Sequence, residues 1–190
     1  MQLVFASNNK NKIAEIQAML PESIQILSLS DIGCHEDIPE TAHTIEGNAI
    51  LKADYVTQNY GYDCFADDSG LEVDALGGAP GVYSARYAGE QKDDGDNIDK
   101  LLAELEGIIN RKANFKTVIA LNYNGGQHLF TGIANGEIIH EKRGNFGFGY
   151  DPVFVPVGLE CTFAEISQSE KAQISHRGKA TRQLINFLTK

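Results

Sequence analysis

The sequence predicts an α/β protein built on a mixed β-sheet. In the first 60 residues, short apolar runs typical of buried strands alternate with segments of helical periodicity. Later, two strand-like runs at residues 115–123 and 127–134 flank an NGG turn at residues 124–126, which is the pattern of a β-hairpin. Alternation followed by an antiparallel pair favours a mixed sheet flanked by helices.

The N-terminal elements follow from local patterns. Residues 3–6 are apolar and predict a short buried strand, and residues 24–29 predict a second one. Between these strands, residues 13–20 have the composition of a helix. Residues 45–60 predict a longer helix, because its apolar residues recur at helical spacing.

The middle of the chain adds a strand, a turn and a helix. A strand begins at residues 63–66, and we expect its continuation to reach residue 76 with breaks. The glycines and the proline of GGAPG, residues 77–81, predict a turn. Residues 96–106 predict a helix with an acidic first turn, and the hairpin follows it.

The last third ends in a helix. Residues 137–142 can extend the sheet, and GNFGFGYDPVF at residues 144–154 predicts a glycine-rich loop that leads into a short strand. Ser175 can cap the terminal helix. The buried face of that helix is predicted to hold Thr181, Leu184, Ile185 and Leu188.

Composition limits the class of protein. The chain has 190 residues with 42% hydrophobic and 22% charged, which suits one packed domain over residues 1–190, of one or two lobes. We find no signal-peptide pattern and no run long enough to span a membrane. Three widely spaced cysteines argue against a disulfide framework and fit a reducing cytoplasm.

The net charge of −10 disfavours extended nucleic-acid binding, because proteins that bind a duplex are normally basic. The charge is uneven, however. Residues 93–106 carry six acids against one lysine, whereas residues 170–190 carry five bases against one glutamate. An acidic protein with a basic C-terminal segment can hold a small anion.

The run FADDSGLEVDAL places Asp67, Asp68, Ser69 and Gly70 in an otherwise apolar, strand-like segment. A buried carboxylate needs a cation or hydrogen-bond donors. Adjacent residues of a strand face opposite ways, so both carboxylates serve one site only if the strand breaks, and Gly70 permits a break. The chemical interpretation is a Mg²⁺ site, and the alternative is a solvated turn.

A second candidate follows the first strand. It consists of Ser7, Asn8, Asn9, Lys10, Asn11 and Lys12. Backbone N–H groups at a helix start, together with amides and lysines, form a phosphate cradle. The Walker A pattern is absent, and the alternative is an ordinary polar loop with a helix cap.

The glycine-rich loop FGFGYDP is a third candidate. Its glycines let the backbone approach a flat ligand, and Phe148 or Tyr150 could stack on a nucleobase. The alternative is a turn whose aromatic rings are part of the core.

A fourth candidate is SQSEKAQISHRGKA at residues 167–180. Ser167 and Glu170 fit a capping box that starts a short helix bearing Lys171. His176 and Arg177 then open the last helix, where their donors suit an anion or a keto group. The alternative is a solvated basic helix.

An acidic group precedes the helix at residues 45–60. It consists of Glu36, Asp37, Glu40 and Glu46. Most of these side chains are expected at the surface, and one of them could complete a metal site with Asp68. On the helix itself, Asn48 and Lys52 are four residues apart and share a face.

Taken in order, these motifs resemble a known family. SNNKNK, ETAHTIEGNAILKA, ADDSGLEVDALGGAPGVYSARYAG, FGYDPVF and FAEISQSEKAQISHRGKA span almost the whole chain. Their order and spacing are similar to those of the non-canonical purine nucleoside triphosphate pyrophosphatase family, which includes inosine triphosphatase. The resemblance implies an elongated α/β fold of two lobes around a central cleft, a homodimer and Mg²⁺. It also implies hydrolysis of ITP, dITP and XTP to the monophosphate and pyrophosphate.

The resemblance also implies roles for residues. Ser7, Asn9 and Lys12 match the phosphate loop, and Asp68 matches the acid assigned as proton acceptor and metal ligand. Further matches are Ser69 as a substrate contact, Glu40 as the second metal carboxylate, Phe148, Gly149, Tyr150 and Asp151 as the base-binding loop, and Lys171, His176 and Arg177 as C-terminal substrate contacts.

One position departs from the family pattern. Asn11 stands where the family often has glycine, which could alter how closely the loop approaches phosphate. We expect phosphates to gather at residues 7–12, Lys52 and Lys171, with Mg²⁺ held by Asp68 and Glu40. Two alternatives to this function remain. One is a related enzyme, either a nucleotide pyrophosphatase that acts on other modified bases or a phosphatase that releases orthophosphate stepwise. The other is a nucleotide sensor without turnover.

Overall fold

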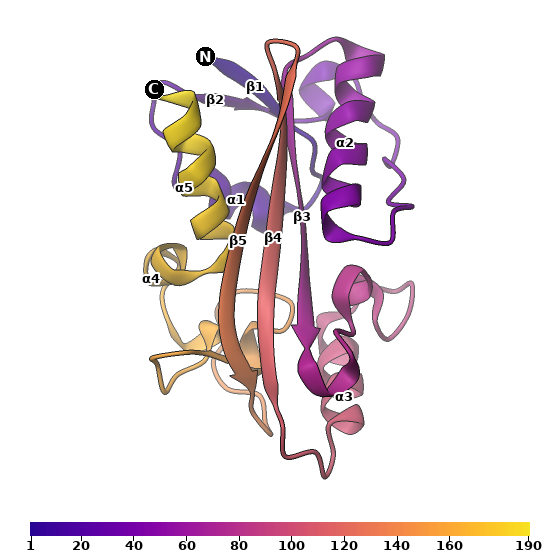
Figure 1. Ribbon diagram of the computed structural model, residues 1–190, viewed down its shortest axis with the longest axis vertical. Coiled ribbons are helices and arrows are strands. Elements are labelled where there is room, and N and C mark those ends of the chain that lie inside the picture. Colours follow the sequence, from indigo (N-terminus) through magenta and orange to yellow (C-terminus); the bar gives the residue numbers. More distant parts are fainter. The chain divides into compact units, whose positions relative to one another are not determined.

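The computed structural model describes residues 1–190 and confirms the predicted mixed α/β fold (Figure 1). Six strands form one sheet in the order β2-β1-β3-β4-β5-β6. β1 is parallel to both β2 and β3, and β5 is antiparallel to β6. The strands are β1 (Gln2–Phe5), β2 (Gln25–Leu27), β3 (Cys64–Val73), β4 (Lys112–Tyr123), β5 (Gly126–Ile138) and β6 (Phe154–Pro156).

The chain forms two compact units, each made of separate stretches of sequence. Unit 1 comprises residues 1–68, 117–132 and 177–190, and unit 2 comprises residues 69–116 and 133–176. The single domain expected over residues 1–190 stays a prediction. No helix in the structure is both long enough and apolar enough to cross a membrane.

Unit 1 packs helices on its strands. The helices are α1 (Lys10–Gln17), α2 (Ile45–Tyr60) and most of α5 (His176–Leu188). Ile16 of α1 and Leu184 of α5 share a buried cluster with Phe5, Phe65 and Ile119 of the strands. In Figure 1, α2 and α5 lie on opposite sides of the strands.

The helix boundaries in unit 1 have local causes. α2 begins after Thr44, whose side chain accepts a hydrogen bond from Gly47 N, and it ends at Gly61 in a left-handed conformation. Both boundaries match the prediction from the spacing of apolar residues, and these two caps are their physical cause. α1 begins three residues earlier than predicted, since the Asn9 side chain caps it by accepting from Asn11 N and Lys12 N. Lys10, Asn11 and Lys12 therefore belong to the first helical turn.

The predicted breaks in the third strand are wrong. β3 runs unbroken from Cys64 to Val73 and contains both aspartates, Ser69 and Gly70. The chain turns only afterwards, in a short 3₁₀ segment at Asp74–Leu76. A continuous strand places successive side chains on opposite faces of the sheet, so Asp67 and Asp68 point in opposite directions.

The predicted hairpin is confirmed as β4 and β5. Asn124 and Gly125 both have positive φ, 50° and 76°. Two consecutive residues of positive φ make the tight turn whose twist suits a hairpin, and asparagine followed by glycine is its preferred sequence. The extension predicted at residues 137–142 is shorter in the structure, because β5 ends at Ile138.

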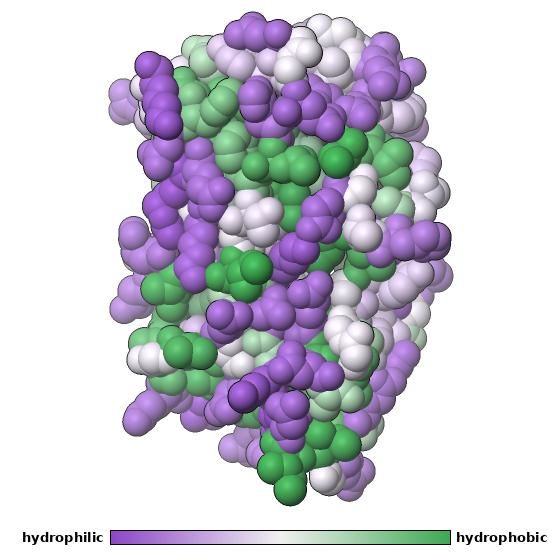
Figure 2. All heavy atoms as spheres, in the orientation of Figure 1, coloured by the Kyte–Doolittle hydropathy of each residue, from purple (hydrophilic) through white to green (hydrophobic).

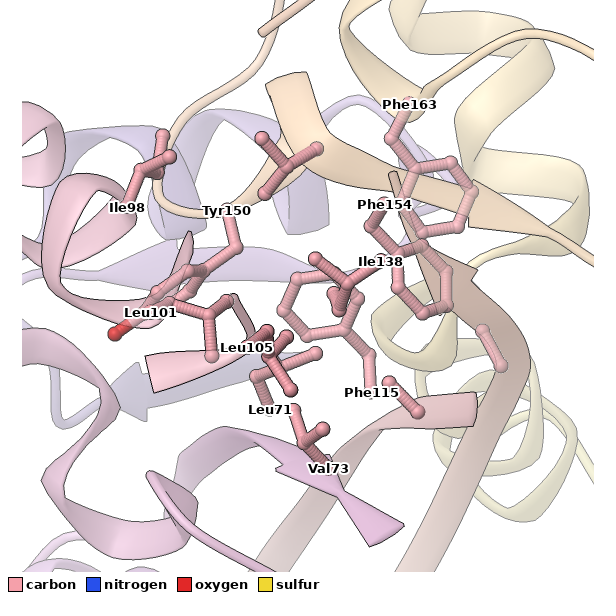
Figure 3. Packing of buried hydrophobic residues seen from close by; sticks show 13 residues of the cluster. Leu71, Val73, Ile98, Leu101, Leu105, Phe115, Ile138, Tyr150, Phe154 and Phe163 are labelled. Carbon is pink, nitrogen blue, oxygen red and sulfur yellow. The ribbon is translucent and has the colours of Figure 1, made fainter. Parts of the chain in front are cut away.

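Unit 2 has its own core around an aromatic cluster (Figure 3). The rings of Phe115, Phe154 and Phe163 pack together, with centroids 4.7–6.1 Å apart. Leu101 of α3 (Asp94–Glu104) and Leu105, the residue after this helix, belong to the same cluster. The short helix α4 (Gln168–Ile174) begins with the predicted capping box of Ser167 and Glu170.

Hydrophilic and hydrophobic residues alternate over the face drawn in Figure 2. The connection between α3 and β4 exposes apolar side chains to solvent, and Ile109 within it is 97% exposed. Behind them, Arg111 is buried and donates to the carbonyls of Leu105, Ile138 and Ile139. The hydrogen bonds of Arg111 therefore anchor the exposed connection to the rest of unit 2.

Candidate functional site

Unit 1 holds a network of seven charged side chains, of which four are buried and three are half-buried. Its members are Lys12, Glu15, Glu40, Lys52, Asp67, Asp68 and Arg177. Three helices, one strand and the loop before α2 contribute to it. Most members were predicted as site residues from separate motifs, and the structure joins them by ion pairs.

Asp67 is held by two cations. Its side chain is fully buried, with Lys12 Nζ at 3.3 Å and Arg177 Nε at 3.2 Å from Oδ2. Burial by itself raises the pKa of Asp67, but the positive charges of Lys12 and Arg177 outweigh this, and the net result is a lowered pKa. Asp67 therefore stays ionised in the folded protein.

Asp68 lies in a different environment although it is the next residue. Lys52 Nζ is 3.8 Å from its Oδ1, and Asn48 Nδ2 donates to its Oδ2 at 3.3 Å. Burial raises the pKa of Asp68, and the nearby charge of Lys52 offsets this only in part. Two neighbouring carboxylates thus have pKa values shifted in opposite directions.

Lys52 connects Asp68 with Glu40. Its ammonium lies 2.5 Å from Glu40 Oε1 and donates to the carbonyl of Asp67 at 2.8 Å. Burial lowers the pKa of Lys52, but the negative charges of Asp68, Glu40 and Asp67 outweigh it and raise the pKa above its usual value. The two carboxylates predicted as metal ligands therefore approach one ammonium group.

Arg177 has a second carboxylate partner that the sequence did not suggest. Arg177 Nη1 lies 2.5 Å from Glu15 Oε2, and Glu15 is on α1. The predicted alternative of a solvated basic helix is wrong for Arg177, since its side chain is buried. Its Nε donates to Asp67 and its Nη1 to Glu15, so Arg177 joins β3 to α1.

The polar run after β1 mostly faces solvent. Asn8, Asn9, Lys10 and Asn11 are exposed and Ser7 is half-buried, with Ser7 Oγ accepting from Asn9 N at 3.2 Å. Lys12 alone reaches the charged network. Burial lowers the pKa of Lys12, with Asp67 opposing that effect.

Unit 2 contains a smaller polar group around Asp151. Asp151 Oδ2 accepts from Lys171 Nζ at 2.6 Å and from the backbone N–H of Phe148 at 2.9 Å. Lys171 Nζ also lies 5.0 Å from the centre of the Phe148 ring. Asp151 and Lys171 are both buried, so this pair fixes the shape of the glycine-rich loop.

The aromatic residues of the loop differ from one another. Tyr150 is buried in the unit 2 core and donates through its hydroxyl to the carbonyl of Ser84 at 2.8 Å (Figure 3). For Tyr150 the alternative interpretation, an aromatic ring that is part of the core, is therefore correct, and this ring is unavailable for stacking on a base. Phe148 is half-buried. Gly149 N donates to Asp94 Oδ2 at 2.7 Å, a loop anchor that sequence reasoning missed.

His176 also lies in unit 2. Its ring stacks on Phe115 with centroids 4.6 Å apart and an interplanar angle of 10°. Ser69, the predicted substrate contact after Asp68, is half-buried on β3. The structure thus places part of the predicted residues in a charged group of unit 1 and part in an aromatic-lined group of unit 2, while residues 7–11 lie outside the charged group.

A hollow elsewhere in unit 2 contains none of the predicted site residues. Its volume is about 450 Å³, and its lining includes Lys112, Asn114, Glu137 and Val155. The buried carboxylates and lysine with shifted pKa values, Asp67, Asp68 and Lys52, lie in unit 1 instead. Those features are better markers of chemistry than a concave surface alone.

On a mixed α/β fold, a network of two lysines, one arginine and four carboxylates with shifted pKa values is typical of a functional site. The chain belongs to the Ham1 family, whose sequence pattern it matches over residues 3–187.

Individual proteins support the assignment to this family. The chain is 75% identical over 187 residues to a dITP/XTP pyrophosphatase of Flavobacterium psychrophilum, covering 98% of each chain. It is 45% identical to a dITP/XTP pyrophosphatase of Bacillus subtilis, covering 98% of this chain and 96% of that protein.

Solved structures agree with these sequences. The fold is similar to that of the Staphylococcus aureus Ham1 protein, with a TM-score of 0.91 and 43% identity, covering 100% of this chain and 98% of that one. A HAM1 protein from Coxiella burnetii gives a TM-score of 0.92 at 42% identity with the same coverage.

Proposed function

We propose that this protein is a nucleoside triphosphate pyrophosphatase that hydrolyses dITP, XTP and ITP to the monophosphate and pyrophosphate. Relatives with 45–75% identity are named dITP/XTP pyrophosphatases. Such an activity removes deaminated purines from the nucleotide pool. We further propose that the enzyme is cytoplasmic and forms a homodimer. Light scattering of the purified protein tests the dimer directly.

The observation that carries the proposal is the divergence of Asp67 and Asp68. Asp67 is kept ionised by Lys12 and Arg177, whereas burial raises the pKa of Asp68. Neighbouring groups whose environments push their pKa values apart have separate acid–base roles. We assign Asp68 to the chemistry and Asp67 to holding the cations around it.

In this mechanism Asp68 orients the attacking water and accepts its proton as the water approaches the α-phosphorus. A raised pKa brings a carboxylate closer to the range of an effective general base. Lys12 and Lys52 supply positive charge beside it, which offsets charge that develops on phosphate oxygens. Phosphoryl transfer depends mainly on such positioning and electrostatics.

The donor set in unit 1 fits Mg²⁺. The ion is commonly bound by one or two carboxylates together with substrate phosphates, and Asp68 and Glu40 meet at Lys52 as such a pair. The network has three cations and four carboxylates, so a triphosphate meets an excess negative charge there. When bound, Mg²⁺ supplies charge neutralisation of the phosphate oxygens.

We propose that the unit 2 loop at residues 148–151 contacts the purine, with Phe148 as its aromatic surface and His176 among the donors. Hypoxanthine and xanthine present a 6-keto acceptor where adenine presents an amino donor. A protein N–H that faces position 6 of the purine donates to the keto oxygen of hypoxanthine or xanthine, whereas it meets the amino donor of adenine unfavourably. Arg177 remains a predicted donor beside its pairing with Asp67; an unchanged preference for ITP over GTP in Arg177→Ala would exclude it.

The proposal is tested with a panel of nucleoside triphosphates, with Mg²⁺ and with chelator, measuring both phosphate products. We expect pyrophosphate and monophosphate from dITP, XTP and ITP, little turnover of ATP, and no turnover with chelator. Release of orthophosphate would identify a stepwise phosphatase instead. Tight binding without any product would identify a nucleotide sensor.

A further inference from the structure

Asn48 is a buried side chain of unit 1 that no motif assigned to the site. It lies on α2 one turn before Lys52 and is 1% exposed. Its amide makes two hydrogen bonds of opposite direction. Oδ1 accepts from the backbone N–H of Ala42 at 2.9 Å, and Nδ2 donates to Asp68 Oδ2 at 3.3 Å.

The first bond fixes the direction of the second. A backbone N–H can only donate, so the oxygen of the Asn48 amide must face Ala42. The NH₂ group is then directed at Asp68 and holds its Oδ2. The other oxygen, Asp68 Oδ1, is left on the side of Lys52, 3.8 Å from the ammonium.

The same amide anchors the loop that carries Glu40. Ala42 is two residues after Glu40, in a segment without helix or strand. Asn48 thus binds the loop by its oxygen and Asp68 by its nitrogen, while Lys52, one turn along α2, contacts both carboxylates. One helix face therefore sets the spacing between Asp68 and Glu40.

We propose that Asn48 is a positioning residue that holds Asp68 and the Glu40 loop at the spacing required to bind a divalent cation and to orient water. This inference rests on the proposed pyrophosphatase function. Groups that orient metal ligands typically change metal affinity or activity about 10–100-fold when they are removed. A site that is loose by about 0.5 Å loses its productive geometry.

Asn97 provides a matched control in unit 2. It lies on α3, is 2% exposed and braces a loop in the same way. Its Oδ1 accepts from Ala88 N at 2.7 Å, and its Nδ2 donates to the carbonyl of Ala85 at 3.1 Å. It differs from Asn48 in bonding a carbonyl instead of a carboxylate, so it reports the purely structural effect of losing such an amide.

The experiment compares Asn48→Leu and Asn48→Ala with Asn97→Leu and Asn97→Ala. For each protein we measure Tm, kcat and KM for dITP with Mg²⁺, and the dissociation constant of Mn²⁺ alone by electron paramagnetic resonance. The alanine variants keep the test usable if leucine prevents folding. We expect both Asn48 variants to lower kcat by about 10–100-fold and to weaken Mn²⁺ binding about 10-fold, with a smaller change in KM.

The Asn97 variants should lower Tm while kcat per folded molecule and Mn²⁺ binding stay at the wild-type values. Wild-type kcat and Mn²⁺ affinity in the Asn48 variants would overturn the inference. Equal losses of kcat in the two pairs of variants would also overturn it. If the wild-type protein does not hydrolyse dITP, the proposed function fails alone, and the Mn²⁺ constants still decide on Asn48.

Discussion

The two units bury charge in different ways. Unit 1 holds a network of seven charged side chains in which single cations serve several carboxylates. In unit 2, Asp151 forms an ion pair with Lys171 and accepts a hydrogen bond from the N–H of Phe148. The Lys171 ammonium also lies near the rings of Phe148 and Phe163.

This difference separates chemistry from shape. The Asp151–Lys171 pair and the N–H of Phe148 hold the glycine-rich loop. In unit 1, Asp67 and Asp68 have different cationic partners, and their pKa values are shifted in opposite directions. Buried charges with divergent pKa values are typical of reacting groups. Substitutions in the two units should therefore change different measured quantities.

The largest effect is expected for Asp68→Asn. The variant keeps the size of the side chain but removes the proton acceptor, so kcat for dITP should fall by about 10²–10⁴-fold. Stability should not fall, because burial already disfavours the charged form of Asp68. Steady-state kinetics and thermal unfolding measure the two quantities. Near-normal turnover would remove Asp68 from the chemistry.

Asp67→Asn should act on stability instead. This change leaves Lys12 and Arg177 buried next to a neutral side chain, and removing one partner of a buried ion pair costs about 3–5 kcal/mol in the free energy of unfolding. Urea denaturation measures it. A variant as stable as the wild type would show that Glu15 alone neutralises Arg177.

The fold could be predicted where the sequence carries local signals. α2 was predicted to the residue from the helical spacing of its apolar residues, and in the structure Thr44 caps its start and Gly61 ends it. The hairpin followed from Asn124 and Gly125. The unbroken course of β3 could not be predicted, because the cost of carrying two aspartates through a strand is offset by lysines and an arginine distant in sequence.

The charged network could be predicted in part. Motifs identified Lys12, Lys52, Asp68 and Arg177 one at a time. Their pairing depends on which face of β3 each carboxylate takes, and this is settled only when the strand is known to be continuous. Glu15 lies in no motif, and Asn48 lies in ETAHTIEGNAILKA without an assigned role. Their proximity at helical spacing to Lys52 and Lys12 was the available signal.

Gly147→Ala tests the role of the unit 2 loop. Gly147 has a φ of 74°, and a Cβ there would lie 2.0 Å from Asp151 Oδ2. We expect a stability loss of about 1–3 kcal/mol from backbone strain and a raised KM for dITP with little change in kcat. Gly149→Ala is the control, because its φ is 61° but a Cβ there meets nothing within 4 Å. A loss of kcat equal to that of Asp68→Asn would contradict the separation of roles.

The smallest effect concerns Glu36, an exposed carboxylate of unit 1. Hydrogen bonds from the hydroxyls of Tyr60 and Tyr55 lower its pKa to about 2. A lowered folded-state pKa stabilises the protein above the ordinary value near 4.5, and the contribution is lost as pH falls towards 2. Glu36→Gln should therefore be slightly less stable than the wild type at pH 7, and the difference should shrink with acidification. Urea midpoints at pH 7, 5 and 3 measure it, with Tyr60→Phe as the matched removal of a donor. A difference that is constant with pH would show that the two hydroxyls do not favour the ionised carboxylate of Glu36.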